Sequence, residues 1–205
     1  MIIKVCGMRD PDNIRAVEAL GIDLMGFIFW PKSSRFVGER PSYLPENCRR
    51  VGVFVDAAKE DILRTVEEFR LDVVQLHGHE TPEAVGVLKE VLNPAVRIVK
   101  CLAVMTPEDL EQTAAYADVC EAFLFDTKGK LPGGNGKQFD WSVLQGYTGR
   151  LPFILSGGIG PGDAQRIREF RHPACIGIDL NSRFEIAPAL KDAASLKTFI
   201  ETIRQ

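Results

Sequence analysis

Short apolar segments alternate with longer amphipathic segments along the whole chain. Eight of the short segments are rich in β-branched and large apolar residues, a composition typical of parallel strands that are covered on both faces. These predicted strands span residues 2–6, 23–29, 51–55, 73–76, 96–100, 122–126, 153–155 and 176–180. The alternation predicts a strand–helix unit that recurs along the chain.

The amphipathic segments carry helix start signals. A capping residue followed by proline, a common beginning of a helix, occurs at Asp10-Pro11, Thr81-Pro82 and Thr106-Pro107. The predicted helices span residues 12–20, 61–69, 82–91, 107–116, 140–145, 162–170 and 192–203. A helix over residues 41–48 would complete the alternation, although its apolar spacing is the least regular of the set.

Chain length and glycine positions distinguish between two α/β folds. Eight strand–helix units in 205 residues average about 26 residues each, as in a minimal (β/α)₈ barrel, which needs roughly 200 residues. An open doubly wound sheet usually has fewer strands and a glycine-rich turn after its first strand. Here the glycine clusters come late, at residues 133–136 and 157–160. The sequence therefore predicts an α/β protein, a single (β/α)₈ TIM barrel with minimal loops over residues 1–205.

The composition narrows the class of function. The chain is 45% hydrophobic and 26% charged, as soluble globular domains are, and its net charge of −3 provides no basic surface for nucleic acid. It has no apolar run long enough for a membrane span and no signal-peptide core at its amino terminus. The five cysteines are spread widely, without the C-x-x-C pairs of zinc sites. We therefore expect a cytoplasmic protein with reduced cysteines, no metal, no nucleic-acid partner and no membrane partner.

The carboxyl ends of barrel strands are where functional side chains collect. The polar and reactive residues at or just beyond these ends are Cys6, Arg35, Gln75, His77, Asp126, Asp179, Asn181, Ser182 and Arg183. Gly157 and Gly158 follow the seventh strand, where their backbone N–H groups and the helix that begins near Gly160 can bind an anion. This end of the barrel is predicted to hold a phosphorylated small molecule.

Nine short motifs follow one another along nearly the whole chain. They are KVCGM at 4–8, GFIFWPKSSR at 26–35, VGVFV at 51–55, VQLHG at 74–78, FDT at 125–127, GGNGKQFDW at 133–141, LSGGIGP at 155–161, GIDLNSRFE at 177–185 and KD at 191–192. In this order, they resemble the motifs of the phosphoribosylanthranilate isomerases of tryptophan biosynthesis.

The resemblance implies a (β/α)₈ barrel that catalyses an Amadori rearrangement without a metal or an organic cofactor. The reaction opens the ribose of N-(5-phospho-β-D-ribosyl)anthranilate and forms 1-(2-carboxyphenylamino)-1-deoxy-D-ribulose 5-phosphate. By the same resemblance, Cys6 is the general base, Asp126 is the general acid and Arg35 binds the anthranilate carboxylate. The remaining implied contacts are Gln75, His77 and Asp179 for the substrate and Gly157, Gly158, Asn181, Ser182 and Arg183 for its phosphate.

One motif departs from the family. The family commonly has Ser-Ser-Gly after the last strand, where this chain has Asn181-Ser182-Arg183. The change removes a flexible N–H donor and adds a positive charge near the phosphate. We therefore expect the charge of Arg183 to compensate for the lost donor. The glycine-rich residues 133–136 predict a loop over the substrate, and Asp140 is expected to cap the helix that carries Trp141.

The chemistry sets its own requirements. An aldose-to-ketose shift needs an acid that protonates the ring oxygen and a base that removes the proton from C2. The ordinary pKa of a cysteine thiol, roughly 8.5, is too high for a base at neutral pH. We therefore expect the amino end of the helix after Gly7 to lower the pKa of Cys6. His77 either contacts the substrate, orients Asp126 or is a structural histidine. Lys4, on the same strand face as Cys6, is expected inside the barrel.

Two other functions compete with this interpretation. A histidine-pathway phosphoribosyl isomerase performs the same rearrangement with a pair of aspartates, and Cys6 at the position of the base argues against it. A non-catalytic barrel that binds a phosphorylated metabolite would explain the altered loop at residues 181–183, but Cys6 and Asp126 are both intact. The short loops impose no partner chain, which favours a monomer over a homodimer.

Overall fold

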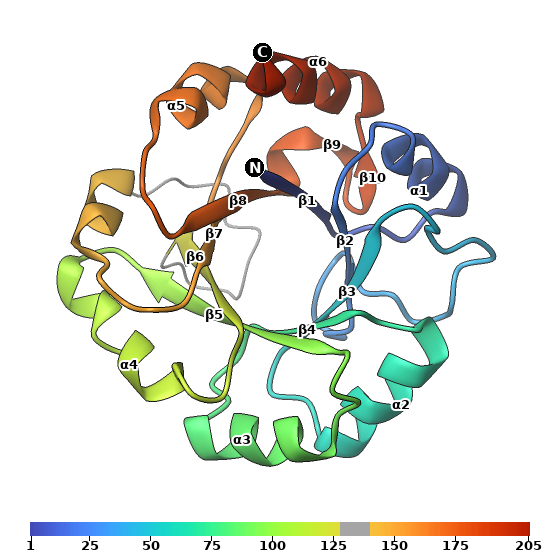
Figure 1. The fold of residues 1–205 in the computed structure, drawn as a ribbon. Coiled ribbons are helices and arrows are strands. Elements are labelled where there is room, and N and C mark those ends of the chain that lie inside the picture. Colours follow the sequence, from blue (N-terminus) through green and yellow to red (C-terminus); the bar gives the residue numbers. More distant parts are fainter. Residues whose placement is uncertain (128–139) are drawn as a thin grey trace.

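Eight parallel strands form a closed barrel in chain order, as Figure 1 shows in a view down the barrel. The structure is a computed structural model that describes residues 1–127 and 140–205. The strands are β1 (Ile2–Cys6), β2 (Leu24–Ile28), β3 (Arg49–Phe54), β4 (Val73–Leu76), β5 (Arg97–Val104), β6 (Ala122–Thr127), β7 (Phe153–Leu155) and β8 (Cys175–Leu180). All eight predicted strands and the predicted barrel are confirmed, whereas the loop expected at residues 133–136 lies outside the described residues.

Helices surround the barrel on its outer face. The α-helices are α1 (Pro11–Glu18), α2 (Lys59–Phe69), α3 (Pro82–Val91), α4 (Thr113–Tyr116), α5 (Ala164–Glu169) and α6 (Ala193–Arg204). Short 3₁₀ helices are η1 (Pro107–Leu110), η2 (Trp141–Gly146), η3 (Pro161–Asp163) and η4 (Ser182–Phe184). The side chains of Asp10, Thr81 and Asp140 each accept a hydrogen bond from a backbone N–H in the first turn that follows, so these three predicted caps are confirmed.

The helix predicted over residues 107–116 is divided into η1 and α4. Asp109 accepts hydrogen bonds from the backbone N–H groups of Met105 and Thr106, which fixes the beginning of η1. The Thr113 hydroxyl donates to the Leu110 carbonyl over 2.6 Å. A side chain that binds the preceding turn in this way competes with the regular helical hydrogen bond, which explains the interruption.

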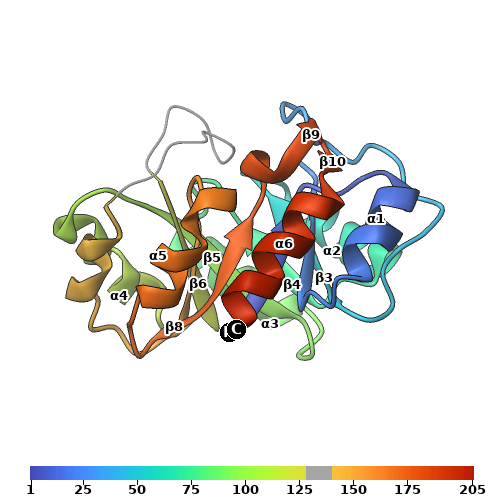
Figure 2. The same cartoon turned by 90° about the horizontal axis from the view of Figure 1, so that it is seen from above.

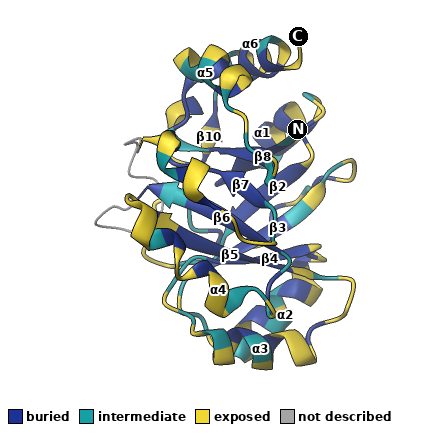
Figure 3. Cartoon of the chain, turned by 60° about the vertical axis from the view of Figure 1, so that its left-hand side comes forward, coloured by how far each residue is buried: buried dark blue, intermediate teal, exposed yellow. Residues whose placement is uncertain are grey.

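The barrel wall separates two apolar layers. Inward-facing side chains fill the interior: Cys6, Leu24, Val51, Val53, Val73, Val99, Cys101, Ala122, Leu124 and Ile154. Outward-facing strand residues such as Val5, Phe27 and Phe125 pack with the helices in a second, larger cluster. In Figure 3 the strands are therefore buried over most of their length, and the helices turn exposed faces outward. This two-sided burial accounts for the nearly continuous apolar runs in the sequence.

The helix expected over residues 41–48 is absent, and that prediction is wrong. The stretch is a loop that crosses the outside of the barrel between α1 and α2 (Figure 1). Pro45 interrupts it and lacks the N–H that a helix needs. The buried Glu18 carboxylate accepts hydrogen bonds from the backbone N–H groups of Glu46 and Asn47 at 2.6 and 2.5 Å and from the Tyr43 hydroxyl at 2.5 Å. These contacts hold the backbone in a non-helical path.

A small antiparallel hairpin follows β8 and was not predicted. Its strands are β9 (Glu185–Ala187) and β10 (Leu190–Lys191). In Figure 2 the hairpin stands at the end of the barrel opposite the two chain termini, which is the end where the barrel strands finish. It therefore adds side chains to the predicted functional face.

The five cysteines are all unpaired thiols. Among the helices of the described residues, none combines the length and apolar character needed to cross a membrane.

Candidate active site

Cys6 ends strand β1 inside the rim of the barrel. Its side chain is only 3% exposed and belongs to the interior cluster. A Cβ atom on Gly26 of the adjacent strand would lie 2.6 Å from the Cys6 Sγ atom, so a glycine at this position makes room for the thiol. Gly7 then has a φ of 78°, which an L side chain rarely adopts, and it turns the chain away from the barrel.

Lys4 lies inside the barrel, as predicted, and its partner is Asp179. The Lys4 Nζ atom is 2.9 Å from the Asp179 Oδ1 atom, and the Ser156 hydroxyl is 3.4 Å from Oδ2. Both charged groups are buried, and burial raises the pKa of Asp179. Burial alone would lower the pKa of Lys4, but the negative charge of Asp179 raises it above its ordinary value. Asp179, which was expected to contact the substrate, is therefore engaged with Lys4.

The pKa of Cys6 moves in the direction opposite to the one expected. Burial raises the pKa of the Cys6 thiol, and the opposing charges of Lys4 and Lys191 do not cancel that effect. Helix α1 begins only at Pro11, and its first-turn N–H of Asn13 is already capped by Asp10. The helix end is thus too distant and too well satisfied to lower the pKa, and that prediction is wrong. Burial therefore favours the thiol form of Cys6 over the thiolate in the free protein.

Asp126 lies near the end of β6 and faces His77, which follows β4. The Asp126 Oδ2 atom is 3.5 Å from His77 Nε2, and His77 Nδ1 is 3.2 Å from the Gln75 amide nitrogen. Burial by itself lowers the pKa of His77, but contacts with Cys101 and Asp126 raise it well above its ordinary value. Of the three interpretations left open for His77, the geometry supports the one in which it orients Asp126.

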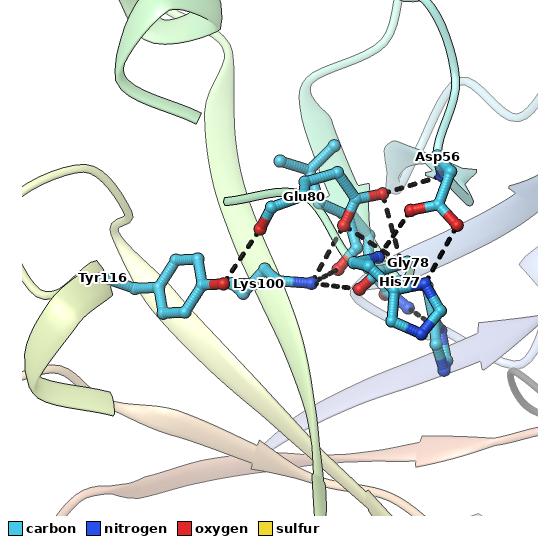
Figure 4. A network of polar contacts seen from close by, with 9 residues as sticks. Asp56, His77, Gly78, Glu80, Lys100 and Tyr116 are labelled. Carbon is cyan, nitrogen blue, oxygen red and sulfur yellow. Dashed lines mark hydrogen bonds and ion pairs between the residues drawn. The ribbon is translucent and has the colours of Figure 1, made fainter. Parts of the chain in front are cut away.

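A buried charge network holds the turn that carries His77 (Figure 4). The Lys100 Nζ atom, 2% exposed, donates to Glu80 over 2.9 Å and to the Gly78 carbonyl over 2.8 Å. Glu80 accepts in turn from the backbone N–H groups of Gly78 and Asp56. Neither Glu80 nor Lys100 was predicted from the sequence. The signal present in the sequence was a lysine at the end of an otherwise apolar strand.

Arg35 is held by Glu185, a hairpin residue that was not predicted from the sequence. Its Nε and Nη2 atoms lie 2.8 and 2.6 Å from the Glu185 carboxylate oxygens. Lys191, which is fully buried, lies 2.6 Å from the same carboxylate and 2.9 Å from Asn181 Oδ1. Burial opposes these charges, but Arg35 and Lys191 lower the pKa of Glu185. Two cations and one anion leave a net charge of +1 beside Gly7.

The turns after β7 and β8 converge. Gly157 and Gly158 have φ values of 93° and 66°, and a Cβ on Gly157 would lie 2.2 Å from Thr127 Oγ1. A Cβ on Gly160 would lie 3.2 Å from Arg183 Nε, so Arg183 packs directly against the glycine turn. These three predicted phosphate contacts, Gly157, Gly158 and Arg183, therefore lie in neighbouring turns, and Ser182 begins η4 beside them. Asn181 instead directs its side-chain oxygen toward Lys191.

The barrel also assembles a group of potential metal ligands that chain spacing did not reveal. One donor atom each of His77, Cys101 and Asp126 lies within 4.8 Å of the other two. His77 follows β4, Cys101 lies within β5 and Asp126 lies near the end of β6, each one strand–helix unit further along the chain. The expectation of no metal rested on the lack of closely spaced ligands in the sequence. Closure of the barrel brings distant ligands together, so their spacing in the sequence no longer argues against a metal site.

Comparison with known proteins gives one consistent result. Residues 3–202 match the family described as N-(5'-phosphoribosyl)anthranilate (PRA) isomerase. The N-(5'-phosphoribosyl)anthranilate isomerase of Phocaeicola vulgatus is 51% identical over 205 residues, which cover 100% of this chain and 98% of that protein.

Solved structures agree with the sequence relatives. The phosphoribosyl anthranilate isomerase of Thermotoga maritima superposes with a TM-score of 0.85 at 31% identity, with 100% of this chain and 99% of that chain covered. A phosphoribosyl anthranilate isomerase in complex with reduced 1-(o-carboxyphenylamino)-1-deoxyribulose 5-phosphate has a TM-score of 0.81 at 30% identity over the same shares of the two chains. The barrel, its strand-end residues and these full-length matches agree, and the chain belongs to the phosphoribosylanthranilate isomerase family.

Proposed function

We propose that this isomerase of tryptophan biosynthesis converts N-(5-phospho-β-D-ribosyl)anthranilate to 1-(2-carboxyphenylamino)-1-deoxy-D-ribulose 5-phosphate, with Cys6 as base and Asp126 as acid. The observation that carries the assignment is their placement. Cys6 and Asp126 end strands β1 and β6, which are separated by β7 and β8 around the closed barrel. A substrate at the mouth therefore lies between a thiol and a carboxyl group.

The two groups act in sequence. Asp126 donates a proton to the ribose ring oxygen, the C1–O bond breaks, and the anthranilate nitrogen and C1 form an iminium ion. Cys6, as thiolate, removes the proton from C2, and the C2–H electron pair forms the C1=C2 bond of an enaminol. Tautomerisation moves a proton from the C2 hydroxyl to C1 and gives the ketone. Lys4 and Lys191, whose positive charges act on Cys6, stabilise its thiolate form while it works.

The anthranilate carboxylate binds Arg35. Glu185 occupies two of the five N–H donors of the guanidinium and fixes its plane, which leaves further donors for a second carboxylate. The net charge of +1 on Arg35, Glu185 and Lys191 favours an anion at this position. Without the hairpin, Arg35 would be a solvated side chain with many rotamers.

The phosphate binds between the turns after β7 and β8. The backbone N–H groups of Gly157 and Gly158 approach the anion closely because neither residue has a Cβ atom. Ser182 and Arg183 supply donors from the second turn, and Arg183 replaces the glycine that the family commonly has there. Asn181 contributes through its backbone, since its side chain is bound to Lys191.

Gln75, His77 and Asp179 support the substrate from beneath. Gln75 and His77 form a chain of contacts that ends at Asp126, so they orient the acid toward the ring oxygen. Asp179 binds Lys4 and thereby keeps a positive charge next to Cys6. We further propose that the chain acts in the cytoplasm and as a monomer rather than a homodimer. Light scattering tests the monomer.

Loss of anthranilate fluorescence, followed with freshly generated substrate, tests the assignment. We expect Cys6→Ser and Asp126→Asn each to lower kcat by about 10²–10⁴-fold, the usual contribution of general acid–base catalysis, while a product analogue still binds. Cys175→Ser and Asp118→Asn are matched controls, because Cys175 lies at the other end of its strand and Asp118 is 89% exposed. Wild-type turnover in both Cys6→Ser and Asp126→Asn would refute the roles given to these residues.

A further inference from the structure

The thiol of Cys101 has no part in the proposed rearrangement, yet it lies in the mouth of the barrel beside residues that do. The register pairs Leu76 of β4 with Lys100 of β5, so the next residues, His77 and Cys101, lie side by side. Asp126 reaches the same place from β6 on the other side of β5. A thiol, an imidazole and a carboxylate thus converge within 4.8 Å of one another.

We propose that His77, Cys101 and Asp126 form a binding site for a thiophilic divalent cation of the Zn²⁺ type, and that the bound cation inhibits the enzyme by excluding its substrate. The inhibition rests on the proposed function, because it follows from the role of Asp126. Cation binding itself does not.

The donor set fits this cation class. Zn²⁺ binds sulfur at about 2.3 Å and imidazole nitrogen or carboxylate oxygen at about 2.0–2.2 Å, which places tetrahedral ligand atoms about 3.3–3.7 Å apart. The His77 Nε2 and Asp126 Oδ2 atoms are already 3.5 Å apart. Pairs as far apart as 4.8 Å need a closer approach of about 1 Å, which small side-chain rotations supply. Hard cations such as Mg²⁺ prefer oxygen ligands, so the thiol selects against them.

The surroundings support the geometry. Histidine ligands of metals usually donate the N–H of the other ring nitrogen to an acceptor. The Gln75 side-chain amide lies 3.2 Å from His77 Nδ1, so turning its oxygen toward Nδ1 provides that acceptor and leaves Nε2 directed at the site. Two buried lysines of the barrel strands already have carboxylate partners, Asp179 for Lys4 and Glu80 for Lys100. Asp126 and His77 are 13% and 15% exposed, so an ion can enter from the mouth.

Three protein ligands leave a coordination position open toward the mouth, where the substrate binds. A cation on Asp126 prevents this carboxyl group from holding the proton that the ring oxygen receives. The cation and the substrate therefore exclude each other. The expected pattern is an apparent KM that rises with Zn²⁺ concentration at constant kcat.

Co²⁺, a spectroscopic substitute for Zn²⁺, tests binding without the reaction. Added to the full chain in a reducing buffer free of chelators, it should produce a sulfur-to-cobalt charge-transfer band and tetrahedral d–d bands at one equivalent, and Zn²⁺ should remove them. Cys101→Val should lose the charge-transfer band and weaken Zn²⁺ inhibition more than about 100-fold, beyond the usual effect of losing an indirect contact. Cys101→Ser repeats the test in case valine disturbs packing, and Cys120→Ala is the control, since Cys120 lies in the outer cluster.

The outcomes separate the two proposals. A charge-transfer band that persists in both Cys101 variants, or that disappears in Cys6→Ser while remaining in the Cys101 variants, overturns the site. Zn²⁺ inhibition that is equal in wild type and Cys101→Val also overturns it. A Cys101-dependent Co²⁺ spectrum in a chain that fails to turn over the substrate supports the site and refutes the proposed function.

Discussion

Replacing Lys100 with methionine tests whether the network beneath His77 is a structural necessity. Methionine keeps most of the side-chain volume and removes the charge. In the wild type, Lys100 Nζ contacts the Glu80 carboxylate at 2.9 Å and the carbonyls of Gly78 and Leu76 at 2.8 and 3.4 Å. The variant leaves Glu80, only 10% exposed, as a buried anion without its cation.

The structure sets the expected size of the effect. Removing one partner of a buried ion pair costs about 3–5 kcal/mol, because the remaining charge stays buried and uncompensated. Glu80 retains the N–H groups of Gly78 and Asp56, which favours the lower half of that range. At a urea m-value of about 2 kcal/mol/M, a cost of about 3–4 kcal/mol lowers the unfolding midpoint by about 1.5–2 M. In Lys100→Met/Glu80→Gln neither charge remains, so we expect less destabilisation than the sum of the two single variants, by about 0.5–3 kcal/mol.

Urea unfolding followed by tryptophan fluorescence measures these differences. The matched control is Lys89→Met, which removes a lysine from a partly exposed pair with Glu121 at 3.0 Å and should cost no more than about 1 kcal/mol. If Lys100→Met is no more destabilising than Lys89→Met, burial of the pair does not determine its energy and the reasoning fails.

Three further predictions concern charge. Arg35→Ala should raise KM by about 10–150-fold, the equivalent of a charge-assisted hydrogen bond of about 1.5–3 kcal/mol; steady-state kinetics with an unchanged KM and kcat/KM would place Arg35 outside the site. Because burial raises the pKa of Cys6, log(kcat/KM) should rise with pH from 6 to beyond the ordinary thiol value of roughly 8.5, and a flat profile would contradict a thiolate base. The hydrogen bonds to Glu18 lower its pKa against the effect of burial, so its stabilisation is present at neutral pH and is lost as the pH falls through the folded-state pKa. Glu18→Gln should therefore be less stable than the wild type by about 1–3 kcal/mol at pH 7. In urea unfolding, this difference should shrink below a pH of about 4.3. A difference that stays constant with pH would contradict the role given to Glu18.

The sequence was informative where local pattern decides structure. The apolar runs of the strands and the proline-preceding caps at Asp10 and Thr81 depend on neighbours within a few positions, and the structure confirms them. The loop at residues 41–48 was mispredicted because Glu18, far away in sequence, takes the N–H groups of Glu46 and Asn47.

The site shows the same division. Cys6 and Asp126 were identified as candidates because strand ends are readable from the sequence. Glu185 and Lys191 were not identified, because their positions depend on a short hairpin that folds back over Gly7 and meets Arg35. Burial likewise raised the pKa of Cys6 through the packing of the whole barrel, which no single motif encodes.

The pair formed by Arg35 and Glu185 links the order of synthesis to the onset of function. The two residues are 150 positions apart, so a growing chain on the ribosome has completed all eight barrel strands before Glu185 and Lys191 are added. Until the hairpin is made, the Arg35 guanidinium has no Glu185 carboxylate to hold it. The fixing of Arg35 and the completion of the outer layer by helix α6, whose residues Leu196, Phe199, Ile200 and Ile203 are buried, therefore both follow the last barrel strand.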